Sequence, residues 1–437
     1  MSFPSTHPPD GLVASRAYSK VMWRIVPILL AVYGLGFIDR VNVSYAQLAM
    51  HNQLGFTDAI YGLGAGLFSV GYLLFEIPSN LVLAKFGGRR SIAVIMAFWG
   101  FASAATALIA TPFQFYIVRF TLGMFESGLF PGLVLYVSFW FPGLKRGWVF
   151  ALLTIASLVA NTVSGPVSGW ILETMDGVSG IRNWQWLFIL EALPSLIWGG
   201  VAYVMLVDRP IHAAWLSAAE KAVILDDLAE EERQKATGAA SRQTLFRDPG
   251  IYVLGFGIFA VLCGYYAVTY WMPMIIRAAG VSNMLHVGLY AMIPNIFAVL
   301  AMLLNARFAG ASSERRWHFS IPLFLAAIGL ALTSIQGNLP LSLFALSIAF
   351  AGVMTALPIF WVMVTAYLPS SNAPVGIAFI NSIGVIAGFA SPYLVGYIKN
   401  STGSMVGALV PMWLAMAAGA VVVPLCMPAR RRPRATV

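Results

Sequence analysis

The sequence predicts an all-α polytopic membrane protein with twelve transmembrane helices in two parallel six-helix repeats. Hydrophobic residues make up 59% and charged residues 10% of the 437 residues, whereas a soluble domain has roughly 25% charged residues. The apolar runs are unbroken over about 20 residues, the length of a spanning helix, and do not alternate as transmembrane β-strands do. Related motifs also recur in the two halves. A soluble protein is therefore excluded.

Short polar connections separate the predicted spans. The spans cover residues 21–40, 58–84, 91–110, 113–140, 147–171, 185–207, 249–277, 284–307, 318–336, 341–367, 374–399 and 405–427. We therefore expect an N-terminal bundle over 1–207, a cytoplasmic linker over 208–248 and a C-terminal bundle over 249–437. Ser217 and Glu220 in the linker have the spacing of a capping box, which predicts a short helix.

Matching motifs in the two halves indicate an internal repeat. They are residues 85–90 after the second span with 307–316 after the eighth, and Pro166-x-x-Gly169 in the fifth span with Pro392-x-x-x-Gly396 in the eleventh. Many secondary transporters consist of such repeats and bind their substrate between them, near the membrane midplane. Gly62, Gly64 and Gly66 in the second span predict a close contact with another helix.

The net charge of +9 reflects membrane topology and not nucleic-acid binding. Of the 26 Lys and Arg residues, 21 lie in the tails and connections on one side and three on the other, while Arg40 and Arg119 lie inside spans. This bias predicts a multi-pass protein of the cell membrane, inner or plasma, with both termini cytoplasmic. The basic tail over 430–434 is expected to contact anionic lipid. Cys263 and Cys426 lie in apolar runs, so neither a disulfide nor a metal site is expected.

Among the charged residues in the predicted spans of the N-terminal half, four form two groups by their spacing. Asp39 and Arg40 are adjacent at the end of the first span, and Arg119 and Glu126 are seven residues apart on one face of the fourth. An ionised side chain at the bilayer centre costs about 2.5–3.5 kcal/mol, so such residues need compensation. Neighbouring residues point about 100° apart on a helix. We therefore expect Asp39 to reach Arg119 while Arg40 faces the cavity.

These charges have a structural and a functional interpretation. They could form a fixed ion network that holds helices in register, but buried ion pairs are often near neutral in net stability. In the functional interpretation Arg40 binds a substrate carboxylate bidentately, and Asp39 or Glu126 carries a proton. An anion near Arg40 competes with these acids for the cation and so favours their protonation. Glu173 and Glu191 are expected at the membrane interface.

The chain resembles the anion:cation symporters of the major facilitator superfamily over nearly its whole length. The resemblance rests on Asp39-Arg40-Val-Asn42, on residues 61–80, on Arg119-Phe-x-Leu-Gly-x-x-Glu126-Ser-Gly, on Gly165-Pro166-x-Ser-Gly169 and on residues 378–384 with Gly388, Phe389 and Pro392. It implies the major facilitator fold and proton-driven uptake of sugar acids, tartrate-like hydroxy acids or aromatic carboxylates. It also implies that Asp39 and Glu126 are protonation sites, Arg40 the carboxylate ligand, Arg119 the partner of the acids and Tyr72 a cavity residue.

Two departures from the superfamily pattern concern the cytoplasmic gate. The loop motif after the second span usually contains Gly and Asp where this chain has Asn80 and Ala84. The loop after the fourth span usually has an acid near Arg146, which is absent here. The cytoplasmic gate must therefore be held by other contacts.

Polar aromatic residues in the C-terminal half are candidates for substrate contact. Tyr265 and Tyr266 in the seventh span, Trp361 in the tenth and Asn381 in the eleventh could stack on a ring or bind hydroxyl groups. Each could equally belong to an aromatic belt or the core. Their number favours an aromatic or hydroxylated carboxylate over a short, bare acid.

The predicted function is proton-coupled symport that imports an organic carboxylate by alternating access. A proton-independent facilitator or exchanger of organic anions is the alternative. No enzyme is expected, because the five histidines lie in tails, loops or span ends. Export of cations is disfavoured by Arg40. We expect no cofactor and no nucleic-acid partner, and a monomer that interacts with the anion, protons and the bilayer.

Overall fold

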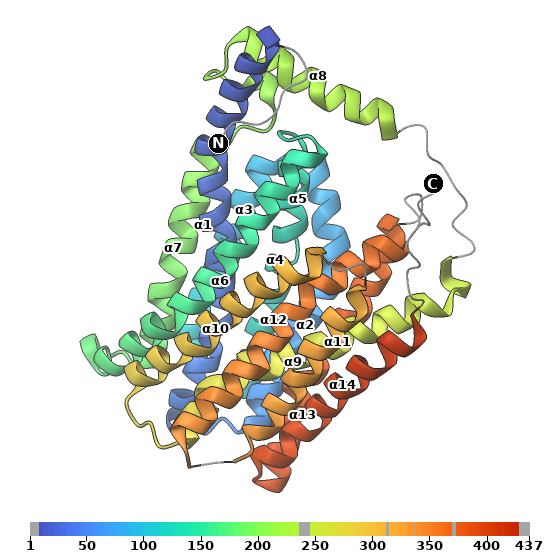
Figure 1. Cartoon of the computed structure of the whole chain (residues 1–437). Helices are drawn as coiled ribbons and strands as arrows, with labels where there is room; N and C mark the ends of the chain where they lie inside the picture. The colour runs from blue at the N-terminus through green and yellow to red at the C-terminus, as the bar shows by residue number, and fades with distance from the viewer. Residues whose placement is uncertain (1–7, 236–244, 312–313, 336, 369–372, 428–437) are drawn as a thin grey trace.

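The computed structural model describes residues 8–235, 245–311, 314–335, 337–368 and 373–427, and within them the chain is helical (Figure 1). The predicted lipid contact at 430–434 lies outside these residues. The N-terminal half contains α1 (Pro8–Leu54), α2 (Asp58–Phe86), α3 (Gly88–Ala105), α4 (Pro112–Glu126), α5 (Leu129–Ser138), α6 (Gly143–Thr174) and α7 (Asn183–Met205). The linker contains α8 (Ala218–Lys235). The C-terminal half contains α9 (Pro249–Ala278), α10 (Met284–Ala311), α11 (Arg315–Leu332), α12 (Leu339–Tyr367), α13 (Ala373–Thr402) and α14 (Met405–Cys426).

Eleven membrane spans in the described residues are long and apolar enough to cross a bilayer. One of them is formed by α4 and α5 together, which are separated by a short break at Ser127 and Gly128. The remaining predicted span corresponds to α11, whose 18 residues include Arg315, Arg316 and His318 at its start. It packs against α12 and α14 and so completes the C-terminal bundle.

The first helix is much longer than its predicted span. Helix α1 continues to Leu54, whereas the sequence prediction ends at residue 40. The polar residues that follow Arg40, such as Asn42, Ser44 and Gln47, are buried against neighbouring helices. Their polarity therefore does not mark the membrane surface. As a consequence, Asp39 and Arg40 lie inside the helix and not near its end.

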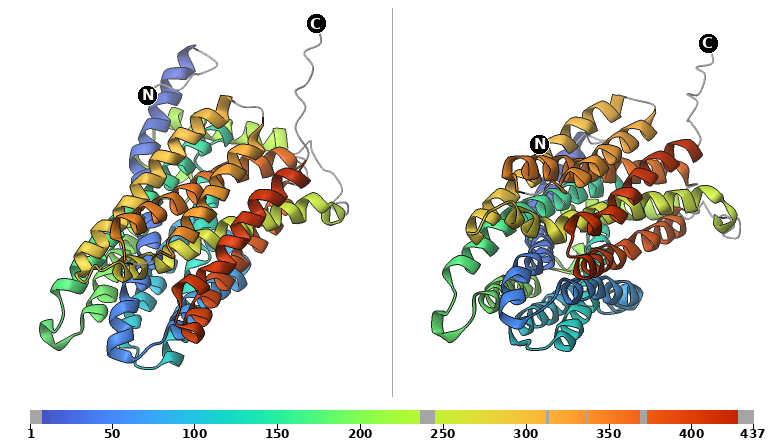
Figure 2. Two further views of the ribbon diagram at one scale, coloured as in Figure 1. Left: turned by 60° about the horizontal axis from the view of Figure 1, so that its bottom comes forward. Right: turned by 90° about the horizontal axis from the view of Figure 1, so that it is seen from below.

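Equivalent helix pairs pack together in the two halves, as the repeat predicts. Helix α2 packs on α4, α3 on α7 and α1 on α6, and correspondingly α10 packs on α12, α11 on α14 and α9 on α13. Figure 2 shows from below that the blue-to-green and the yellow-to-red helices form two neighbouring groups. The all-α fold with two six-helix repeats is confirmed.

The two bundles meet through the predicted glycine and proline motifs. Helix α2 packs on α13, and α6 packs on α10. A Cβ atom on Gly62 would lie 2.4 Å from the carbonyl oxygen of Pro392, and one on Gly288 would lie 2.0 Å from that of Gly165. Only glycine allows this backbone approach. Gly62 and Gly288 lie in the first turns of α2 and α10, so both contacts are at the end of the molecule away from α8 (Figure 1).

The linker helix α8 begins with the predicted capping box. The Ser217 backbone N–H donates to Glu220 Oε2 at 2.9 Å, and the Glu220 N–H donates to Ser217 Oγ at 3.3 Å. Lys20 Nζ of α1 lies 2.7 Å from Glu220 Oε1. The hydrogen bonds from Lys20 and from the Ser217 backbone lower the pKa of Glu220. The same glutamate therefore caps α8 and fixes it to α1.

Helix α8 also supplies the acids that the loop after α5 lacks. Arg146 Nη2 lies 2.7 Å from Glu231 Oε2, and Lys145 Nζ lies 3.5 Å from Asp227 Oδ2. The Tyr18 hydroxyl of α1 donates to the same Asp227 carboxylate at 2.7 Å. The linker helix is thus attached to the N-terminal bundle by charged and polar contacts.

Candidate functional site

The centre of the N-terminal bundle contains an ion pair between α1 and α4. Arg40 Nε donates to Glu126 Oε1 at 3.1 Å, and Arg40 Nη2 contacts the same oxygen. The Glu126 side chain is 3% exposed and that of Arg40 is 21% exposed. The guanidinium carbon also lies 5.2, 5.4 and 5.6 Å from the ring centres of Phe37, Phe68 and Tyr72. Arg40 is therefore held by one acid and three rings and keeps part of its surface open.

Asp39 does not pair with Arg119, so that prediction is wrong. The Asp39 carboxylate accepts hydrogen bonds from Asn42 Nδ2 at 3.2 Å, Ser103 Oγ at 2.9 Å and Ser195 Oγ at 3.1 Å. No described lysine or arginine is within ion-pair distance of it. The 100° step between neighbouring residues turns Asp39 toward α3 and α7, whereas Arg119 is on α4. Asp39 is thus a buried carboxyl held by neutral donors.

Arg119 is a buried cation, and some of its hydrogen-bond donors have no partner among the described residues. It is 1% exposed and shares the buried face of α4 with Glu126, as its spacing predicts. Its guanidinium carbon lies 5.0 Å from the Phe68 ring centre. Its Nε and Nη2 have no hydrogen-bond partner among the described residues. Unpaired buried donors of a charged group are costly, so Arg119 has donors that an anionic group could satisfy.

Glu191 is buried, so its predicted position at the membrane interface is wrong. It is 4% exposed on α7, and Ser168 Oγ donates to its Oε1 at 2.7 Å. The periodicity of α7 could have revealed this, because Glu191 lies on the same stripe as Phe188, Ser195 and Gly199, which are all buried.

The C-terminal half contributes tyrosines to the site. Tyr265 and Tyr266 of α9 interact electrostatically with Arg40, as does Tyr72 of α2. Trp361 on α12 and Asn381 on α13 are half-buried. In the described structure neither makes a hydrogen bond, ion pair or ring contact with Arg40. The structure therefore brings three of the five predicted aromatic and amide residues to the charges.

Two further residues belong to this region and were not predicted. Tyr33 lies two turns before Arg40 on α1, packs on Phe37 with ring centres 5.1 Å apart, and interacts electrostatically with Arg40. Asn161 of α6 is 8% exposed and interacts with Tyr265. The seven-residue spacing of Tyr33 and Arg40 was the available signal for the first. Asn161 joins the site because α6 of one bundle lies near α9 of the other. The spacing of residues along a single helix contains no information about such a contact.

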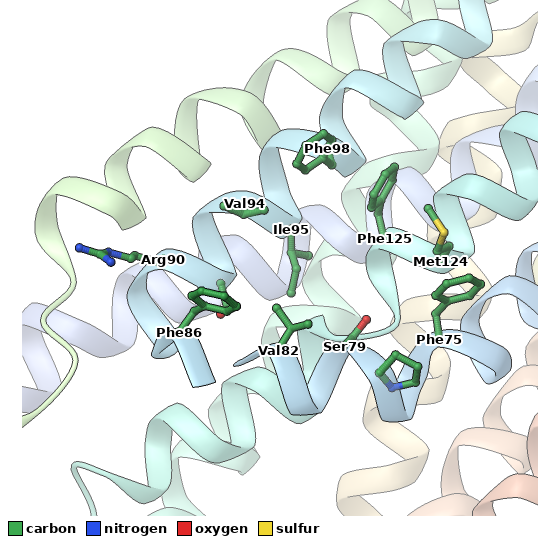
Figure 3. A pocket seen from close by; sticks show the side chains of 12 residues that line it. Phe75, Ser79, Val82, Phe86, Arg90, Val94, Ile95, Phe98, Met124 and Phe125 are labelled. Atoms are coloured by element: carbon green, nitrogen blue, oxygen red, sulfur yellow. The ribbon is translucent and has the colours of Figure 1, made fainter. Parts of the chain in front are cut away.

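Neither a metal cluster nor the outer groove between α2, α3 and α4 involves these residues. No group of three or more His, Cys, Asp or Glu in the described ranges could hold a metal ion. A groove of about 530 Å³ lies between α2, α3 and α4. It is lined mainly by apolar side chains such as Val82, Phe98 and Phe125, with Arg90 at one end (Figure 3). None of the predicted site residues lines it. The charged centre of the N-terminal bundle is therefore the candidate site.

Comparison with known proteins shows the family. The model of the Major Facilitator Superfamily matches residues 29–392. The chain is 40% identical over 404 residues to a putative tartrate transporter of Agrobacterium vitis, covering 92% of this chain and 90% of the relative. It is 39% identical over 393 residues to the putative metabolite transport protein NicT of Pseudomonas putida, covering 90% of each.

A solved structure agrees with the fold. The inward-open xylose transporter XylE from E. coli superposes with a TM-score of 0.73 at 14% sequence identity, covering 96% of this chain and 98% of that one. At this identity the likeness concerns the fold alone. The family match and the identity to the transporters above show that the chain belongs to the Major Facilitator Superfamily and is a multi-pass membrane transporter.

Proposed function

We propose that this transporter is a proton-coupled symporter that imports an organic carboxylate by alternating access, with Arg40 as the carboxylate ligand. The observation that carries the proposal is the ion pair of Arg40 and Glu126, in which the acid is buried and the cation is partly open. A substrate carboxylate can approach Arg40 only from its open side. It then offers the guanidinium a second anion.

Competition for Arg40 couples the two transported species. When a substrate carboxylate binds Arg40, Glu126 loses its counter-charge while it stays buried. A buried carboxylate without a partner is strongly disfavoured, so Glu126 takes up a proton. Asp39 is the second predicted proton carrier, and its neutral donors allow it to exist with or without a proton. Substrate binding and proton binding thus favour each other.

Arg119 supplies a second cation for the anion or for the acids. Its two unpaired nitrogens lie on the same buried face of α4 as Glu126. The role implied for it, a partner of the acids, fits a cycle in which Glu126 or the substrate turns to Arg119 after leaving Arg40. No ion pair links Arg119 to either acid in this conformation of the described chain.

The contacts between bundles support an inward-facing conformation. Asp58 of α2 pairs with Lys399 of α13 at 2.9 Å, and the Tyr61 hydroxyl donates to the Tyr270 carbonyl at 3.1 Å. These contacts lie at the end away from α8. The bias of basic residues assigns the α8 side to the cytoplasm, with both termini there. The proposed moving units are the bundles over 1–207 and 249–437 of one monomer, joined by 208–248.

The substrate class follows from the groups around Arg40. Tyr72, Tyr265 and Tyr266 offer hydroxyl groups and ring faces near the cation. They suit a carboxylate that carries hydroxyl groups or an aromatic ring. A relative is named a putative tartrate transporter, and tartrate is a hydroxylated carboxylate of this class. Trp361 and Asn381 stay candidates for contact with the far end of a longer substrate.

Transport by the purified protein in liposomes tests the proposal. Sugar acids, hydroxy acids, benzoates and hydroxyphenylacetates are offered with and without an inward proton gradient. We expect at least one class to accumulate, and each pH unit to add about 1.4 kcal/mol of driving force per proton. Uptake that equilibrates equally fast without a gradient would instead support the alternative, a proton-independent facilitator or exchanger.

A further inference from the structure

A second buried carboxyl lies beside Asp39, on a helix that the proposed mechanism does not use. Glu191 of α7 is 4% exposed. Its Oε1 accepts the hydrogen bond from Ser168 Oγ at 2.7 Å, and its Oε2 has no hydrogen-bond partner among the described residues. One of its two oxygens is therefore satisfied and the other is not.

No cation compensates this carboxyl. Helices α1, α3 and α6 and the short turn Thr106–Leu108 pack against α7. From α1, Asp39 and Tyr45 interact with Glu191 electrostatically. The charged residues of α3 and the basic residues of α6 lie in the first turns of those helices, and the short turn carries no charge. No described lysine or arginine is within ion-pair distance of Glu191. An ionised carboxylate in such a place is strongly disfavoured, and more so beside Asp39.

Asn42 connects the two carboxyl groups. Its Nδ2 donates to Asp39 Oδ1 at 3.2 Å, and its side chain also interacts with the Glu191 carboxyl. Its own Oδ1 is buried without a donor. The site therefore contains more acceptors than donors. A proton on Glu191 turns one of these acceptors into a donor.

We propose that Glu191 is a proton-binding site that carries a proton in this conformation and is coupled to Asp39 through Asn42. The two carboxyls then titrate as a pair and not as independent groups. Its part in transport rests on the proposed symport. Together with Glu126 the pair supplies a second proton, so a monoanion moves with net positive charge. Such transport responds to the membrane potential by about 2.3 kcal/mol per 100 mV for each net charge.

Infrared spectroscopy tests the proton directly and independently of transport. At neutral pH the purified protein should show the carbonyl stretch of a protonated carboxyl, and Glu191→Gln should remove it. Ser168→Ala keeps the carboxyl but removes its hydrogen bond, so it should shift the band without abolishing it. A band that is absent from the unmodified protein, or unchanged in Glu191→Gln and Ser168→Ala alike, would overturn the proposal.

Transport stoichiometry tests the coupling. In liposomes Glu191→Gln should lower the protons moved per substrate from about two to about one and make uptake insensitive to membrane potential. Glu173 of α6 is an exposed carboxyl in the same bundle and provides the control, so Glu173→Gln should leave the stoichiometry unchanged. An unchanged ratio in Glu191→Gln contradicts the coupling. Failure of the unmodified protein to move protons at all would refute the proposed symport, while the infrared band would still decide whether Glu191 is protonated.

Discussion

At the scale of the residue, Arg40 is the group on which the proposed anion site depends. Replacement by alanine should weaken substrate binding about 30-fold or more, because removing one partner of a buried, hydrogen-bonded charge pair costs about 2–5 kcal/mol. Arg40→Lys keeps the charge but loses the bidentate geometry of the guanidinium. We expect its affinity for substrate to lie between those of the unmodified protein and Arg40→Ala. Calorimetric titration of the purified protein measures both. Retained affinity in Arg40→Ala would remove this residue as the ligand.

Substitution of Glu126 should distinguish substrate binding from proton coupling. Glu126→Gln is nearly isosteric and cannot change its charge, so it should bind substrate without taking up a proton at this position. Exchange of labelled for unlabelled substrate across liposomes should then persist, whereas accumulation driven by a proton gradient should be lost. Measuring both activities in the same preparation provides the control for folding. Gradient-driven accumulation at the unmodified level would exclude Glu126 as the required proton carrier.

At the scale of the element, α8 depends on an ionised Glu220. Its pKa is lowered in the folded protein, so the stabilisation that it gives is complete above the ordinary glutamate pKa of about 4.3. It is lost as the pH falls through the lowered value. A spin label at exposed Ala229 should therefore be immobile at pH 7 and become mobile on acidification.

The matched variant for α8 is Glu220→Gln. It loses the ion pair with Lys20 and weakens the cap with Ser217, so the label should already be more mobile at pH 7. It should also respond less to acid. Identical mobility curves for the two proteins would show that Glu220 does not hold α8 in place.

At the scale of the whole molecule, the Asp58–Lys399 pair joins the bundles at the end away from α8. Both side chains are 18% exposed, and such partly exposed pairs contribute up to about 1 kcal/mol. Asp58→Asn should therefore raise the outward-facing population about two- to five-fold. Distances between spin labels on the two bundles report that population. The backbone contacts of Gly62 and Gly288 remain in this variant, so the shift should be modest. No shift would mean that the glycine contacts alone close this end.

The sequence alone predicted the fold well, because the length of the hydrophobic runs reports on the spans and the recurring motifs report on the repeat. It also predicted that α4 carries Arg119 and Glu126 on one buried face. Prediction from the sequence failed where the hydrogen-bond partner of a residue lies on another helix. Asp39 turned out to contact Ser103 and Ser195, which are small and polar and give no signal in a hydrophobic span.

Glu191 is a second residue whose environment is determined by neighbouring helices and not by its own helix. A single acid near the start of a predicted span was assigned to the interface, but the burial of α7 by α1 and α3 determines its environment. Such packing depends on the register between helices, which spacing along one helix does not contain. Glu191, which the sequence does not predict as a site residue, thus lies beside Asp39 in the structure.

The central claim is that a carboxylate arriving at Arg40 makes Glu126 take up a proton. The direct measurement is proton uptake by the purified transporter in weakly buffered detergent solution when substrate is added, followed with a pH indicator. We expect the unmodified protein to take up protons in proportion to bound substrate, and Glu126→Gln to bind substrate with that uptake reduced. Substrate binding without proton uptake in the unmodified protein, or with equal uptake in Glu126→Gln, would contradict the claim.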